Sequence, residues 1–86
     1  MRTLDSEKVI RNFTGPDGRL KQIPVKNAKL QIVLAHLAAE FSPGRQYPEK
    51  DVNETLKRFH DDFCTLRRNL VDYGFLTRAD GLYWRS

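Results

Sequence analysis

The chain has almost no cysteine, and Cys64 is the single one among its 86 residues. One cysteine excludes an internal disulfide and any zinc site built from paired cysteines. No apolar run approaches the roughly 18 residues that a membrane-spanning helix needs, and acidic residues interrupt the apolar patch of the N-terminal segment MRTLDSEKVI, so it is not a signal peptide. These absences predict a cytoplasmic protein with no membrane partner.

Recognisable catalytic motifs are also missing. Gly15 and Gly18 are not followed by the GK[ST] motif of a phosphate-binding loop. His60, Asp61 and Asp62 are adjacent, but a metal or acid–base site needs several converging groups, and neighbours at a helix start rarely point the same way. We interpret them as a helix cap with a hydrogen-bonded histidine, and a hydrolase using them is the least favoured hypothesis. The sequence therefore predicts no enzyme, no metal and no cofactor.

Acidic residues are absent between Gly18 and Ala39, although the whole chain has a formal net charge of only +4. This stretch contains a basic arm, made of Arg19, Lys21, Lys26 and Lys29. Mild basicity permits contact with nucleic acid but does not require it. The arm could follow a phosphate backbone, or it could be a solvated segment, which is the slightly favoured interpretation.

The clearest pattern lies at the C-terminal end. Apolar residues recur there at the helical spacings of three and four, at Phe63, Leu66, Leu70 and Tyr73. Gly74 follows them, where a helix often ends in a left-handed residue. Residues 75–79 and 82–86 are rich in aromatic and branched side chains, and Asp80-Gly81 between them is typical of a type I′ turn. The pattern predicts a helix followed by a β-hairpin, with Tyr83 and Trp84 on its two faces.

Three further helices are predicted upstream. Ser6 is expected to cap a short helix that ends near Asn12, and a long helix is expected over residues 27–41. The long helix is apolar on most sides, with Ile32, Ala35 and Ala39 on its back, so it should lie in the middle of the fold. Pro48 suits the start of the next helix, and Asp61 or Asp62 can cap the last one. Residues 19–24 are expected to form an edge strand or an extended arm, and residues 46–47 a short strand that pairs with the hairpin.

This order predicts an α+β fold: a small winged helix-turn-helix-like domain with about four helices and a C-terminal hairpin as its wing. We treat residues 1–86 as one domain, with residues 1–12 as an N-terminal helical extension. The expected core contains the stripe residues Leu34, Leu37, Leu56, Leu66 and Leu70. Cys64 is expected to be a small packed residue.

Several short motifs carry a resemblance to a known family. They are Gly18-Arg19-Leu20-Lys21 with Ile23-Pro24, Tyr47 with Glu49-Lys50-Asp51-Val52-Asn53, Phe59-His60-Asp61-Asp62, Leu66-Arg67-Arg68, Leu70-Val71-Asp72-Tyr73-Gly74 and Tyr83-Trp84-Arg85. Over residues 13–85 the chain resembles DUF2087, a bacterial domain of unknown function. Such domains occur alone or joined to helix-turn-helix or acetyltransferase modules. They are usually named as transcriptional regulators, so the resemblance implies a role in transcription regulation. Pro48 departs from the family pattern, which tends to have a hydroxyl residue there.

The helix before the hairpin is the candidate DNA-reading element. The residues expected to contact DNA are Thr65, Arg67, Arg68 and Asn69, of which Arg68 and Asn69 are the types that read base edges. Lys57, Arg58, Arg78 and Arg85 are expected near the DNA backbone. Asp61 and Asp72 share the outward face and have the wrong sign for phosphate, and Arg68 could simply pair with Asp72 one turn away. The leading hypothesis is a domain that binds double-stranded DNA or assists in binding it. The alternative is a protein-interaction or homodimerisation module without DNA.

Overall fold

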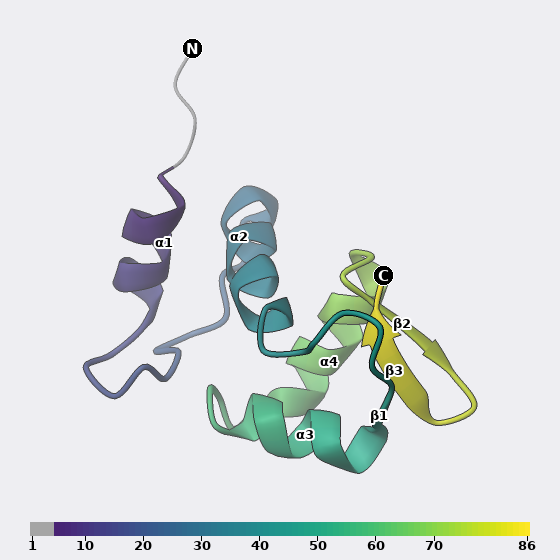
Figure 1. Cartoon of the computed structure of the whole chain (residues 1–86). Coiled ribbons are helices and arrows are strands. Elements are labelled where there is room, and N and C mark those ends of the chain that lie inside the picture. The colour runs from purple at the N-terminus through teal and green to yellow at the C-terminus, as the bar shows by residue number, and fades with distance from the viewer. Residues whose placement is uncertain (1–4) are drawn as a thin grey trace.

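The computed structural model describes residues 5–86 of the chain. Its helices and strands, in chain order, are α1 (Ser6–Phe13), α2 (Asn27–Ala38), β1 (Tyr47–Pro48), α3 (Glu49–Lys57), α4 (Phe63–Asp72), β2 (Leu76–Ala79) and β3 (Leu82–Arg85) (Figure 1). From α2 onward this is the order of a winged helix-turn-helix, with α3 and α4 as the helix pair and the β2–β3 hairpin as the wing. The predicted α+β class and winged-helix order are confirmed.

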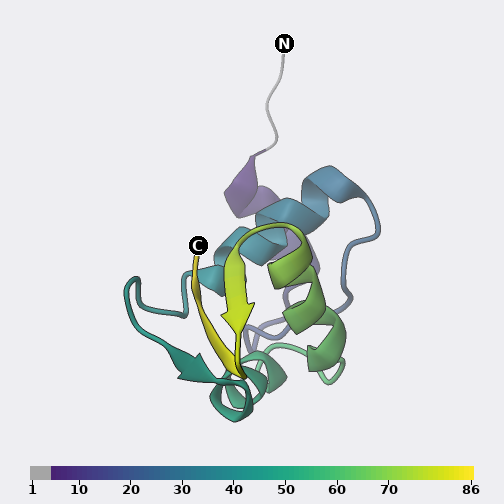
Figure 2. The ribbon, with the colours of Figure 1, turned by 90° about the vertical axis from the view of Figure 1, so that its right-hand side faces the viewer.

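The sheet has three antiparallel strands in the order β1-β3-β2. Tyr47 of β1 pairs with Tyr83 of β3, which confirms that a short first strand pairs with the hairpin, although it includes Pro48 and begins one residue later than predicted. The hairpin turns at Asp80 and Gly81, whose φ angles of 53° and 77° are the positive values that a type I′ turn requires. Figure 2 shows the hairpin with α4 beside it and α2 behind. Gly74, with φ of 81°, turns the chain from α4 toward β2 as expected.

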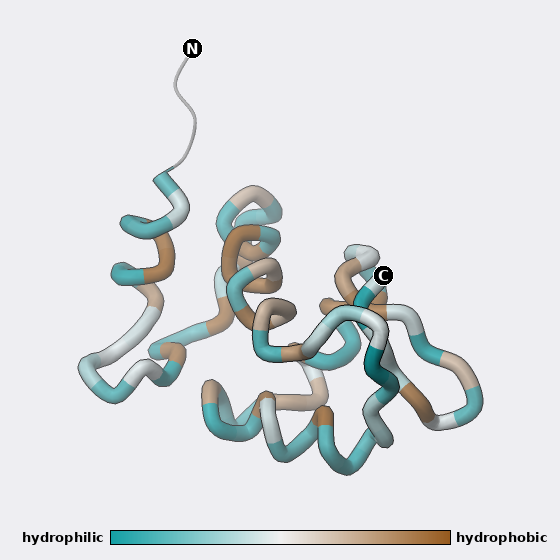
Figure 3. Tube along the Cα trace, viewed as in Figure 1, coloured by the Kyte–Doolittle hydropathy of each residue, from teal (hydrophilic) through white to brown (hydrophobic). Residues whose placement is uncertain are grey.

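The core lies between α2, α3, α4 and the hairpin. All five leucines predicted to be buried, Leu34, Leu37, Leu56, Leu66 and Leu70, have 0% exposure. On the other side of α2, α1 packs by way of Val9, and the hydrophobic positions of α1 face α2 (Figure 3). Among residues 5–86, no helix combines the length and the apolar character needed to cross a membrane.

Two predicted helix boundaries are corrected by the contacts at the helix ends. Asp5, not Ser6, caps α1, because its Oδ1 accepts hydrogen bonds from the amides of Glu7 (3.1 Å) and Lys8 (3.3 Å). Ser6 is instead the first helical residue. The α-helix α2 ends at Ala38 rather than near residue 41. Of the two candidate caps for α4, Asp62 is the one that accepts a hydrogen bond, from the amide of Thr65.

Some side chains are more exposed than the sequence pattern indicates. Tyr73 is 41% exposed, because α4 ends before it and the chain turns away at Gly74. Cys64 is exposed rather than packed. The back of α2 is only partly covered: Ile32 is half-buried, whereas Ala35 and Ala39 are exposed.

An edge strand or an extended arm was expected over residues 19–24. The strand is not formed there, since Leu20 makes only an isolated bridge to Thr14.

Candidate nucleic-acid interface

Helix α4 is held by its apolar stripe, which decides which side chains face outward. Leu66 and Leu70 are fully buried, so Arg68 is exposed, and Thr65 and Asn69 are half-exposed. The turn before α4 is closed locally, because Nδ1 of His60 accepts a hydrogen bond from the Asp62 amide at 2.9 Å. This confirms the interpretation of these residues as a cap with a hydrogen-bonded histidine.

A polar network joins α4 to α3 and to the hairpin. The Tyr83 hydroxyl donates a hydrogen bond to Oε1 of Glu49 at 2.8 Å, and Nε of Arg67 lies 3.9 Å from the same oxygen. Arg67 also donates to Oδ1 of Asn53. Burial raises the pKa of Tyr83, and the hydrogen bond and negative charge of Glu49 raise it further. Arg67, predicted to contact DNA, is thus half-buried and held by Glu49 and Asn53 of α3.

A small polar notch of about 160 Å³ lies between α4 and the hairpin. Its lining residues are Arg67, Arg68, Val71, Asp72, Arg78 and Tyr83. Arg68 and Arg78 are both exposed, and neither takes part in an ion pair within residues 5–86. The pairing of Arg68 with Asp72 considered from the sequence is therefore not formed. The fold brings two free guanidinium groups together, one from the helix and one from the wing.

The other predicted backbone contacts lie elsewhere. Arg58 pairs with Glu40 at 3.3 Å, and the Lys57 ammonium lies 5.3 Å from the centre of the Phe63 ring. Arg85 donates to the main-chain carbonyl of Phe41 at 3.4 Å. None of these three basic side chains lines the notch. Each of these three side chains already contacts another group within the chain, so each is a weaker candidate for a contact with DNA phosphate.

Arg19, the first residue of the basic arm, has a structural role that the sequence did not reveal. Nη1 of Arg19 donates to the carbonyls of Lys57 (2.9 Å) and Arg58 (3.1 Å), and its Nη2 lies 2.9 Å from Oδ1 of Asp61. A cation at these last carbonyls of α3 is favoured by the helix dipole. Lys21 and Lys26 are exposed and Lys29 is half-buried. Arg19 therefore lies beside the α3–α4 turn, whereas Lys26 and Lys29 are at the start of α2.

No grouping of three or more His, Cys, Asp or Glu side chains suited to a metal ion occurs within the described part of the chain. The notch between α4 and the wing gathers two exposed arginines, Arg68 and Arg78, together with one acidic residue, Asp72. This arrangement can contact an anionic polymer along one face of the domain.

The fold and this notch define a small winged-helix domain. The chain belongs to the DUF2087 family, described as an uncharacterized protein conserved in bacteria, whose model matches residues 19–85. The match runs from the basic arm to the end of β3, so α1 precedes it. No curated protein and no solved structure matches the chain.

Proposed function

We propose that this domain binds double-stranded DNA through α4 and the wing and acts, without catalysis, in bacterial transcription regulation. The observation that carries the proposal is the pair of free arginines, Arg68 and Arg78, at the notch between α4 and the hairpin. Helix-turn-helix domains place their second helix in the major groove, where side chains reach base edges. Here the second helix is α4, and the wing supplies a cation beside it.

The charges on α4 suggest how the helix would meet the duplex. Thr65, Arg68 and Asn69 face outward in the first two turns, and an arginine and an asparagine are the side chains that read guanine and adenine edges. Asp61, just before the helix, pairs with Arg19, whereas Asp72, in the last turn, has no ion-pair partner within residues 5–86 and would be repelled by phosphate. The N-terminal part of α4 would therefore lie deeper in the groove, with Arg78 near the sugar–phosphate backbone.

The test is a salt-dependent titration of a labelled random duplex, followed by fluorescence anisotropy. Arg78→Ala should weaken binding to all duplexes alike and lower the slope of log affinity against log salt by about one. Arg68→Ala should cost roughly 1–3 kcal/mol on a duplex selected for tight binding and should relax the base preference. Lys21→Ala, which removes an exposed cation from the basic arm, serves as the matched control and should have little effect.

Wild-type protein that shows no salt-dependent binding at low ionic strength would contradict the proposal. Equal losses from the Arg78, Arg68 and Lys21 substitutions would also contradict it, because they would indicate diffuse attraction rather than a defined face. The alternative function, a protein-interaction module without DNA, is favoured by one observation: Asp72 lies in the same lining as the two arginines. Under that alternative, Arg68→Ala leaves DNA binding unaltered.

A further inference from the structure

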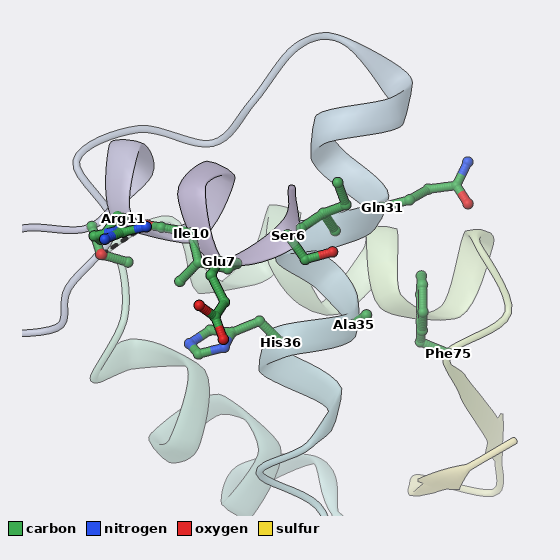
Figure 4. A pocket seen from close by; sticks show the side chains of 10 residues that line it. Ser6, Glu7, Ile10, Arg11, Gln31, Ala35, His36 and Phe75 are labelled. Atoms are coloured by element: carbon green, nitrogen blue, oxygen red, sulfur yellow. Dashed lines mark hydrogen bonds between the residues drawn. The ribbon is translucent and has the colours of Figure 1, made fainter. Parts of the chain in front are cut away.

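A second surface lies at the N-terminal side of the domain, where α1 and α2 enclose an open groove of about 840 Å³. Its apolar lining comes from Ile10 of α1, Ile32 and Ala35 of α2, and Phe75 after α4. Figure 4 shows Glu7 and Ile10 on one wall and His36 and Ala35 on the other. One wall of the groove is formed by α1, which precedes the residues matched by the family model.

The groove-facing side of α1 has an ordered charge pattern. Glu7, Ile10, Arg11 and Thr14 line the groove at positions i, i+3, i+4 and i+7 of the helix and its C-cap. An acid and a base thus stand one turn apart with an apolar residue between them. Glu7 and Arg11 are both exposed, and the ion pairs of residues 5–86 include neither.

We infer that a second copy of this chain docks on this surface, with the two α1 helices antiparallel about a two-fold axis. A two-fold interface uses the same patch on both subunits, so the patch must complement itself. Reversing the direction of α1 exchanges its acidic and basic ends. Glu7 of each copy would then lie opposite Arg11 of the other, giving two equivalent ion pairs, whereas parallel helices in register would oppose like charges.

The apolar part of the groove supports a helix as the occupant. Ala35 is exposed and Ile32 is only half-buried, so apolar surface of α2, between the polar residues Gln31 and His36, is left uncovered by its own fold. A small residue such as alanine allows another helix to approach closely. Covering Ile10, Ile32 and Phe75 would remove apolar surface from water, which favours association. The apolar residues on the back of α2, which the monomer leaves uncovered, would then lie in an interface between two copies.

This inference does not depend on DNA binding. Figure 1 places α1 and the hairpin at opposite sides of the molecule, with α2 between them. Contact through α1 would therefore leave both arginine notches uncovered. A two-fold dimer that also bound DNA would recognise two related half-sites, because the symmetry of the protein is mirrored in its site.

The test is sedimentation equilibrium of the full chain across a concentration series. Wild-type protein should rise from the monomer mass of 10.0 kDa toward about twice that value. Glu7→Arg and Arg11→Glu should each weaken the dimer by roughly tenfold or more, since each sets like charges against each other at two places. The double variant Glu7→Arg/Arg11→Glu should regain most of the association. Lys8→Glu, a charge reversal at an exposed position of α1 outside the lining, is the matched control and should associate like wild type.

Ala35→Arg provides an independent variant from α2, because it fills the groove from an exposed position and leaves the core untouched. It should be monomeric, with a circular dichroism spectrum like that of wild type. A wild-type protein that is monomeric at every concentration overturns the inference. So does a dimer that all variants retain, or a double variant that stays as dissociated as the single ones. Substitutions at Arg68 or Arg78 should leave the mass unchanged, so failure of DNA binding and failure of dimerisation are separable.

Discussion

Replacing Leu66 by alanine tests the central feature of the fold, the packing of α4 into the core. Leu66 has 0% exposure and belongs to the core formed by buried side chains of α2, α3, α4 and the hairpin. The substitution removes three carbon atoms from a site enclosed by other apolar groups. We expect it to lower the free energy of unfolding without changing the helix content of the remaining folded protein.

The magnitude follows from two contributions. Losing three buried carbon groups costs about 2.4 kcal/mol at roughly 0.8 kcal/mol each, and the cavity left behind adds to this, so that buried leucine-to-alanine changes span about 2–5 kcal/mol. A chain of this length is expected to have a total stability of about 4–13 kcal/mol. A loss of about 3 kcal/mol is therefore a large part of the total and should lower Tm by about 12–24 °C.

Urea denaturation followed by circular dichroism measures the loss of unfolding free energy directly. This requires that the unfolding free energy of wild type and of variant fall with urea concentration at the same slope. Cys64→Ala is the matched control, because Cys64 lies on the same helix but is exposed, and it should change stability by less than about 0.5 kcal/mol. A loss below about 0.5 kcal/mol for Leu66→Ala would refute the packing described for α4. Equal losses for the two variants would do the same.

Two further predictions concern polar contacts that connect distant parts of the chain. Arg19→Ala should lower the free energy of unfolding by about 1–2 kcal/mol, because its guanidinium bonds two carbonyls at the end of α3, whereas Lys21→Ala should change it by less than about 0.5 kcal/mol in the same urea titration. Tyr83→Phe tests the raised pKa of Tyr83. The folded state favours the neutral phenol, so its stabilising contribution is present below the ordinary pKa of 10.0 and is lost as the pH rises through the higher folded-state pKa. The stability difference between wild type and variant should therefore shrink above pH 10.0, and a difference that stays constant to about pH 11.5 would contradict the burial of this hydroxyl.

The sequence by itself determined the local elements of this protein. Asp80-Gly81 specifies its turn because few residues tolerate positive φ at both central positions, and Gly74 ends α4 for a related reason. The spacing of Leu66 and Leu70 identifies the buried side of α4, since a helix repeats every 3.6 residues. These features depend on residues that are close in sequence, so each could be predicted from a short segment of the chain. The cap of α1 was not, because Asp5 and Ser6 are adjacent and both are good capping residues.

The tertiary structure alone decided which charged side chains are free. Arg67 and Arg68 are adjacent in sequence, yet one is held by Glu49 and Asn53 while the other is exposed. Arg19 looked like part of a solvated arm, but it pairs with Asp61, 42 residues away. An ion pair depends on the distance between two groups in space, and no periodicity within the chain encodes that distance. For the same reason, the sequence could not predict that α4 and the wing meet at one notch or that an open groove lies between α1 and α2. Both features depend on how the helices pack in space.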